Sequence, residues 1–372
     1  MIYNNLKQYI IDQNFNFDLT EEEFKLFTLQ IIDTVNKKFN EQNDITLLYK
    51  FKNQISIILK DLYLINTLKN KVSKLQKLDL PKQRSKEWFD LRKRVLTASS
   101  LASALNKDHF KSKYELIESK IIEKPFEYNE ITEHGVKYEE IATQFYEHLN
   151  NVKILEFGLI PHPDFPIFGA SPDGICDNNS PNEYIGRMLE IKCPPKRKFT
   201  KTVPNHYKYQ ILGQLECCDL EECDFFQVKI SEYSSVSEYN DDVFTSNGEI
   251  NVGYNSKEYP KGCILTYKNS EDKYQYLYPG LFKTYNELNE WIEDKKQWLI
   301  EHEFKFEKIN WWKIERYECT LVKRNKIEWA DIIDDIIDFY KELDYYKNNI
   351  SELQEKLPKK KVIFINTNDC LL

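Results

Sequence analysis

The hydrophobic positions of the first eighty residues recur with the period of an α-helix. Thr20 and Glu23 have the spacing of a capping box, and a run of apolar residues on one helical face follows them: Phe24, Phe27, Ile31, Val35 and Phe39. A second apolar series, from Phe51 to Leu75, is spaced alternately by three and four residues. It predicts a second helix that packs against the first. Pro81 marks a boundary, so we expect residues 1–80 to form a helical region.

Helical and extended patterns alternate over the next two hundred residues. The order is a helix, three short strands, a helix and a strand, over 132–149, 156–160, 167–170, 188–193, 205–218 and 224–230. The polar stretch 234–260 is interpreted as a loop, followed by a hairpin around Cys263 and Tyr274 and a helix over 285–301. We predict an α/β core, a small mixed sheet flanked by helices, over residues 81–303. Residues 304–372 are aromatic-rich and are interpreted as a helical C-terminal extension.

Two polar side chains interrupt the apolar stretch "MLEIKCP" at residues 188–194. In a strand, Glu190 and Lys192 lie on the face opposite Leu189 and Ile191, about 7 Å apart by the strand rise. Burying both charges is costly unless they are paired or bound to another group. An ion pair on an edge strand that faces water is the alternative interpretation.

An aspartate on a turn in "GASPDGIC" favours a functional site over the edge-strand ion pair. Pro172 sets the approach of the chain, Gly174 permits a sharp turn, and Asp173 is held at the end of a strand. If the two strands are neighbours, the Asp173 and Glu190 carboxylates converge, and two hard oxygen donors suit Mg²⁺. The Lys192 ammonium would then orient an attacking water and stabilise developing negative charge.

This arrangement of Pro-Asp, a spacer and Glu-x-Lys resembles the signature of the PD-(D/E)xK nucleases. Further stretches resemble the branch of phage lambda exonuclease and the YqaJ-type alkaline exonucleases: "EWFDLRKRVLTASS", "HGVKYEEIATQFYE" and "HYKYQILGQLECC". The resemblance covers about 220 residues and leaves residues 1–80 and 304–372 uncovered. It implies a restriction-endonuclease-like α/β fold, to which this chain would add helical N- and C-terminal extensions.

The resemblance also implies roles for individual residues. Arg92, helped by Ser99, would bind the 5′-terminal phosphate of DNA, while Trp88 is either a substrate contact or, as we favour, a core aromatic. Glu139 would join the metal site in preference to Glu140, together with the backbone carbonyl of Ile191. Gln210 would approach the site, with Gln214 one turn further on the same helical face. Independently of the resemblance, Lys196 and Arg197 lie in a basic stretch and are expected to contact DNA.

The activity implied is a Mg²⁺-dependent exonuclease, with Mn²⁺ as a substitute, that digests one strand of linear double-stranded DNA from 5′ to 3′ in viral recombination, replication or repair. Implied partners are double-stranded DNA ends and a single-strand annealing protein. The resemblance implies a ring-shaped trimer, which the added helical regions leave open. Alternatives are an endonuclease, an RNA-degrading host-shutoff nuclease and a non-catalytic DNA-binding scaffold.

Composition narrows these classes. Lys and Arg number 52 and Asp and Glu 60, giving a net charge of −8, which argues against a protein that coats nucleic acid without specificity. Basic residues concentrate locally in 82–94 (six basic, two acidic) and in 190–208 (six basic, one acidic). No apolar run reaches the length of a membrane span, and no N-terminal export signal is evident. The eight cysteines are therefore interpreted as reduced structural thiols, in an intracellular setting such as the host cytoplasm or a viral replication site.

Overall fold

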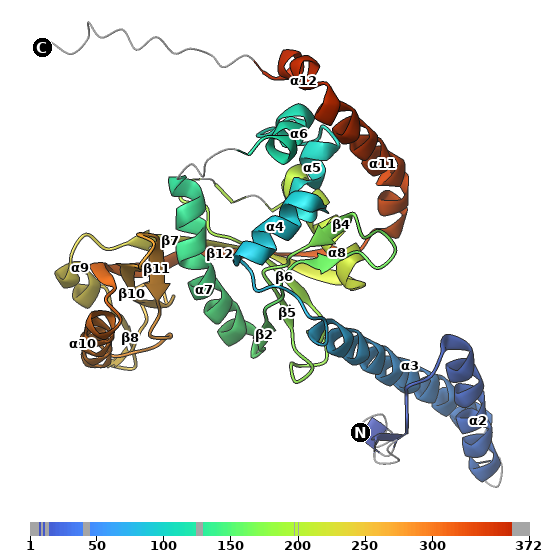
Figure 1. The fold of residues 1–372 in the computed structure, drawn as a ribbon. Coiled ribbons are helices and arrows are strands. Elements are labelled where there is room, and N and C mark those ends of the chain that lie inside the picture. Colours follow the sequence, from blue (N-terminus) through green and yellow to red (C-terminus); the bar gives the residue numbers. More distant parts are fainter. Residues whose placement is uncertain are drawn as a thin grey trace, which may run out of the picture.

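The fold is built on one mixed β-sheet. The computed structural model describes residues 7–8, 10–11, 15–39, 45–123, 129–196, 198–199 and 201–358. Within them a seven-stranded sheet has the strand order β11-β10-β12-β7-β6-β5-β2 (Figure 1). Strands β6 and β7 are parallel, and the other neighbours in this sheet are antiparallel. The strands are β2 (Ile154–Leu155), β5 (Gly174–Cys176), β6 (Met188–Lys192), β7 (Glu222–Glu232), β10 (Lys261–Lys268), β11 (Tyr274–Leu277) and β12 (Lys305–Lys323).

Helices cover both faces of this sheet. Helix α7 (Glu130–Asn150) buries its apolar stripe against Leu189 and Ile191 of β6. Helix α8 (Asn205–Cys218) packs on the other face, where Met188 points. The predicted alternation of side chains along β6 therefore holds, and the α/β fold class, a mixed sheet flanked by helices, is confirmed.

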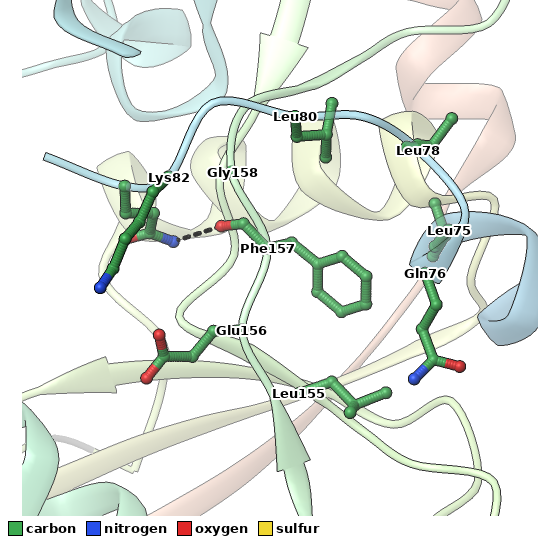
Figure 2. A pocket seen from close by; sticks show the side chains of 10 residues that line it. Leu75, Gln76, Leu78, Leu80, Lys82, Leu155, Glu156, Phe157 and Gly158 are labelled. Carbon is green, nitrogen blue, oxygen red and sulfur yellow. Dashed lines mark hydrogen bonds between the residues drawn. The ribbon is translucent and has the colours of Figure 1, made fainter. Parts of the chain in front are cut away.

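A second, smaller sheet has the order β1-β4-β3 and lies beside α8. Its strands are β1 (Leu96–Thr97), β3 (Ile160–Pro161) and β4 (Phe168–Ala170), accompanied by α4 (Lys86–Arg94), η2 (Ala98–Ser100), α5 (Leu101–Ala104) and α6 (Lys113–Ile121). The predicted strand at 156–160 is wrong, because residues 156–159 lie outside the strands of either sheet. The segment after α3 packs on these residues instead. The two backbones approach so closely that a Cβ added at Gly158 would lie only 2.2 Å from the Pro81 carbonyl oxygen, so the position requires glycine. Figure 2 shows this crossing.

The N-terminal helices form a hairpin that extends away from the sheet (Figure 1). They are α2 (Glu21–Phe39) and α3 (Ile45–Gln76). Both bonds of the predicted capping box are present, from the Thr20 amide to Glu23 at 2.7 Å and from the Glu23 amide to the Thr20 hydroxyl at 3.3 Å. The hairpin has its own core around Ile32, Ile55 and Ile58. The far end of α3 joins the main core through Val72 and Leu75. The side chains of Val35, Phe39 and Phe51 lie outside the description.

The C-terminal region differs from the prediction. Residues 305–323 are not helical but form β12, which pairs with β7 over Glu222–Glu232 and with β10 over Lys261–Lys268. Aromatic and β-branched residues suit a strand, and two neighbours in the sheet satisfy its backbone on both sides. The region is helical only from α11 (Lys326–Asn348) and α12 (Ile350–Lys356) onward. Within the described residues, no helix is both long and apolar enough to span a membrane.

The predicted loop 234–260 is also partly ordered into regular elements. It contains α9 (Val236–Asp241) and an antiparallel pair, β8 (Phe244–Ser246) and β9 (Glu249–Asn251). Two local features favour these short elements: the Ser235 hydroxyl accepts a bond from the Glu238 amide, and Asn247 and Gly248 take the left-handed conformations of the hairpin turn. The predicted hairpin β10–β11 and the predicted helix α10 (Tyr285–Glu301) are present.

Candidate active site

The two strands that carry the Pro-Asp and Glu-x-Lys motifs are direct neighbours. Strands β5 and β6 pair antiparallel, with Gly174 opposite Leu189. Asp173 stands immediately before β5, and its Oδ2 accepts a hydrogen bond of 2.6 Å from the Ile191 amide. Gly174 does not take a left-handed conformation. It is required for close packing, since a Cβ there would lie 2.2 Å from Cγ2 of Ile154.

Glu190 is fully buried and held by donors on β6 and α8. Its Oε1 accepts a 2.7 Å bond from Gln210, and its Oε2 accepts one of equal length from Gln214. The Lys192 ammonium forms an ion pair with the same carboxylate. Gln210 and Gln214 lie one turn apart on α8, as the sequence predicts, and both reach the site. The edge-strand interpretation of Glu190 and Lys192 is therefore wrong, because β6 lies between β5 and β7.

Three carboxylates interact electrostatically here. Burial raises the pKa of Asp173 well above its usual value, and the charges of Glu190 and Glu139 add to this effect. Burial also raises the pKa of Glu139, against the opposing charges of Arg84 and Lys192. Burial alone would lower the pKa of Lys192, but the Glu190 and Asp173 carboxylates outweigh it and raise that pKa. The site thus concentrates negative charge around one ammonium.

This donor set fits a hard divalent cation, although no group of three or more His, Cys, Asp or Glu side chains within the described ranges is already arranged to hold one. Converging carboxylates repel one another unless a cation lies between them. In addition, Oε1 of Gln214 is buried beside Glu190 and has no hydrogen-bond partner in the described part of the chain. Carboxylate and amide oxygens are the ligands that Mg²⁺ accepts.

Arg92 and Ser99 lie together, as the motif predicts. The Arg92 guanidinium donates a 3.1 Å bond to the Ser99 hydroxyl and lies 4.4 Å above the Trp88 ring. Trp88 is 9% exposed, packs on Val95 and Leu159, and donates a 3.1 Å bond to the Ser171 hydroxyl. Trp88 is therefore a core aromatic, as favoured, that also supports Arg92 and the residue two before Asp173.

Sequence reasoning missed residues that organise both parts of the site. Lys120 of α6 donates to the carbonyls of Val95 at 2.7 Å and Arg92 at 3.3 Å, which caps the end of α4. Burial lowers the pKa of Lys120 to about 8, and the charges of Arg92 and Lys111 contribute. Arg84 forms a two-point ion pair with Glu139. A basic residue in a charged stretch carries no sequence signal for such contacts.

The remaining predicted residues are less informative. Glu140 accepts a 2.7 Å bond from Gln144 of its own helix, whereas the Glu139 carboxylate interacts with the charges of Lys192 and Glu190. Glu139 rather than Glu140 therefore belongs to this group of charges. Lys196 is exposed, and Arg197 lies outside the described residues. Cys217, Cys218 and Cys223 are buried in the main apolar core, as expected for structural thiols.

Comparisons with known proteins agree with the motifs. Residues 87–221 match the sequence profile of the YqaJ-like viral recombinase domain. This part of the chain is therefore similar to a YqaJ-like viral recombinase domain. The resemblance inferred from the motifs is thereby confirmed, and the YqaJ-like domain contains Arg92, Glu139, Asp173, Glu190 and Lys192.

Two further comparisons cover longer parts of the chain. The uncharacterized protein R354 of Acanthamoeba polyphaga mimivirus is 30% identical over an alignment of 309 positions. That alignment covers 76% of this chain, and the chain spans 56% of that relative's length. Crystal structures of the alkaline exonuclease LHK-Exo of Laribacter hongkongensis, one of them in complex with dAMP, align with 74% of this chain and 100% of theirs. Their TM-score is 0.41 and their sequence identity 20%.

Proposed function

We propose that this protein is a Mg²⁺-dependent exonuclease that digests one strand of linear double-stranded DNA from its 5′ end. The observation that carries the proposal is the convergence of Asp173 and Glu190 on adjacent strands, with Lys192 beside them. The YqaJ-like domain that contains these residues supports the same reaction class. Mn²⁺ would substitute for Mg²⁺ because it takes the same oxygen ligands.

Each residue has a role that its position supports. Asp173, Glu190 and Glu139, with the Ile191 carbonyl, would hold the metal, which supplies Lewis-acid stabilisation of the charged phosphate. Gln210 and Gln214 keep the Glu190 carboxylate in one orientation through their 2.7 Å bonds. The Lys192 ammonium orients the attacking water and stabilises the negative charge that develops on phosphate oxygens.

Selection of the 5′ end would rest on Arg92. A guanidinium can bind two oxygens of a terminal phosphate at once. A phosphodiester within a strand presents its oxygens differently, so Arg92 would distinguish the end of a strand from its interior. The Arg92 guanidinium stacks on the Trp88 ring and donates a hydrogen bond to the Ser99 hydroxyl, so its orientation is set before DNA binds. Lys196 would contact the DNA backbone, and a single-strand annealing protein would take the 3′ strand that remains.

The test is digestion of end-labelled DNA by the purified protein with Mg²⁺. We expect a 5′-phosphorylated linear duplex to be shortened from the 5′ end, with covalently closed circular DNA and RNA left intact. Lys192→Ala should abolish the reaction, with a rate loss of at least about 10²-fold, while its circular dichroism spectrum and DNA binding remain.

Other outcomes assign other functions. Cleavage of closed circles would indicate an endonuclease, and digestion of RNA in preference to DNA would indicate a host-shutoff nuclease. DNA binding without cleavage of any substrate, in Mg²⁺ and in Mn²⁺, would indicate a scaffold. Activity of Lys192→Ala equal to that of the wild type would refute the mechanism.

A further inference from the structure

The segment that joins α3 to α4 crosses the loop before β3 and is pinned there. The Pro81 carbonyl packs directly on Gly158. Beneath the segment lies a cavity of about 360 Å³, lined by apolar residues such as Leu80 and Phe157 and by polar ones such as Gln76 and Glu156 (Figure 2). The segment precedes the YqaJ-like domain, which begins at residue 87. It links the N-terminal hairpin to the site.

Gln83 fastens this segment to the loop that carries Asp173. Its side-chain amide donates to the Phe157 carbonyl at 2.8 Å, the dashed bond in Figure 2, and to the Pro172 carbonyl at 3.1 Å. Pro172 immediately precedes Asp173. The segment before α4 therefore touches the backbone of the metal-site turn and continues into Arg84.

Arg84 is held in an unusual conformation over Glu139. Its φ is 66°, in the left-handed region that residues other than glycine rarely adopt, and such a conformation persists only where the surrounding structure imposes it. From there the Arg84 Nη2 donates to both carboxylate oxygens of Glu139, at 3.0 and 2.9 Å. The two-point contact occupies the oxygens that would otherwise face a cation.

We infer that Arg84 is a positioning residue that gates the metal site by competing with the divalent ion for Glu139. The inference rests on the proposed function, in which Glu139 is a metal ligand. Glu190 is fully buried and bonded by Gln210, Gln214 and Lys192, so its geometry is set. The Arg84–Glu139 pair differs, because its side chains are 47% and 32% exposed.

That exposure makes the pair exchangeable. Water screens a half-exposed ion pair, so it is weak enough for a divalent ion to displace. Without metal, Arg84 lowers the repulsion between Glu139 and the Asp173 and Glu190 carboxylates. When metal binds, Glu139 must leave the guanidinium, and part of the binding free energy of the metal is spent on breaking this contact.

The test is calorimetric titration of Mn²⁺ into the full chain without DNA. Arg84→Gln should bind Mn²⁺ about two- to fivefold more tightly than the wild type, the range that loss of an exposed ion pair allows. Arg84→Lys, which keeps the charge on a shorter side chain, should fall between them. Arg94→Gln removes the same charge from an exposed position on α4 and should leave the affinity unchanged.

A double-mutant cycle between Arg84 and Glu139 completes the test. In a Glu139→Gln background, the Arg84→Gln change should no longer alter Mn²⁺ affinity. Equal or weaker Mn²⁺ binding by both Arg84 variants, with melting curves like that of the wild type, would overturn the gate while leaving the nuclease proposal intact. A wild-type chain that binds no Mn²⁺ and cleaves no DNA would overturn the proposed function, and the gate with it.

Discussion

Replacing Asp173 with asparagine should stabilise the metal-free protein while it inactivates the enzyme. Burial and the nearby Glu190 and Glu139 carboxylates raise the pKa of Asp173. Ionising such a group at neutral pH destabilises the fold by about 1.4 kcal/mol for each pH unit by which the folded-state pKa exceeds the unfolded one. An asparagine oxygen can still accept the 2.6 Å bond from the Ile191 amide. The expected gain in unfolding free energy is therefore on the order of 1 to 2 kcal/mol.

The pH dependence of this gain follows from the direction in which the pKa moves. Because the pKa in the folded state lies above that of the unfolded chain, the destabilisation appears as pH rises above about 4. Below that pH the carboxyl is protonated in both states, so the advantage of Asp173→Asn should vanish there. At pH 7.5 the substitution should raise Tm by about 1–2 °C per kcal/mol, the shift expected for a chain of this length.

Thermal melts at pH 7.5 in EDTA and in saturating Mg²⁺ provide the assay. Metal at a hundred times its Kd should stabilise the wild type by about 2.7 kcal/mol, and Asp173→Asn should gain nothing. Asp164→Asn, at an exposed position outside the site, serves as the matched control. A variant that melts below the wild type in EDTA, or that metal still stabilises, would refute the reasoning.

Three further predictions test other parts of the molecule. Arg92→Gln should reduce the preference for 5′-phosphorylated over 5′-hydroxyl duplex ends by about ten- to a hundredfold, the worth of a charged hydrogen bond; an unchanged ratio of digestion rates would exclude Arg92 from end recognition. Ile336→Ala, at a fully buried position of α11, should cost about 2–5 kcal/mol in urea unfolding, whereas Ile327→Ala, at a position 76% exposed, should cost less than about 0.5 kcal/mol; similar costs would show that α11 does not belong to the core. Burial alone would raise the pKa of Glu232, but hydrogen bonds, led by that from Lys137, outweigh it and hold this pKa at about 2. This stabilisation is present above about pH 4.3, the usual pKa of a glutamate, and is lost as pH falls towards 2. Glu232→Gln should therefore cost about 1 kcal/mol at pH 7, a value reduced for solvent screening of a side chain that is 40% exposed; a difference from the wild type that is the same at pH 7 and pH 3 would contradict this account.

Local patterns predicted the elements that carry Asp173, Glu190 and Lys192. Helix α8 begins and ends where its pattern indicates. In β6, Leu189 and Ile191 point to one face of the sheet and Glu190 to the other, as the alternation of residues predicts. Strand β12 shows where such reasoning fails. Its charged residues also suit a helix. Only pairing with β7 and β10, which lie tens of residues away, makes the extended form the stable one.

The sequence by itself determined the chemistry available at the site: Asp173 at a strand end, Glu190 and Lys192 on one strand face, and Arg92 within a recognisable motif. These features depend on spacings of a few residues, and the geometry of a helix or strand fixes in which direction side chains at such spacings point. Tertiary structure alone decided which groups meet. The bonds of Gln83 to Pro172 and of Arg84 to Glu139 join residues 89 and 55 positions apart, and such contacts depend on the path of the whole chain, because no local period relates their positions.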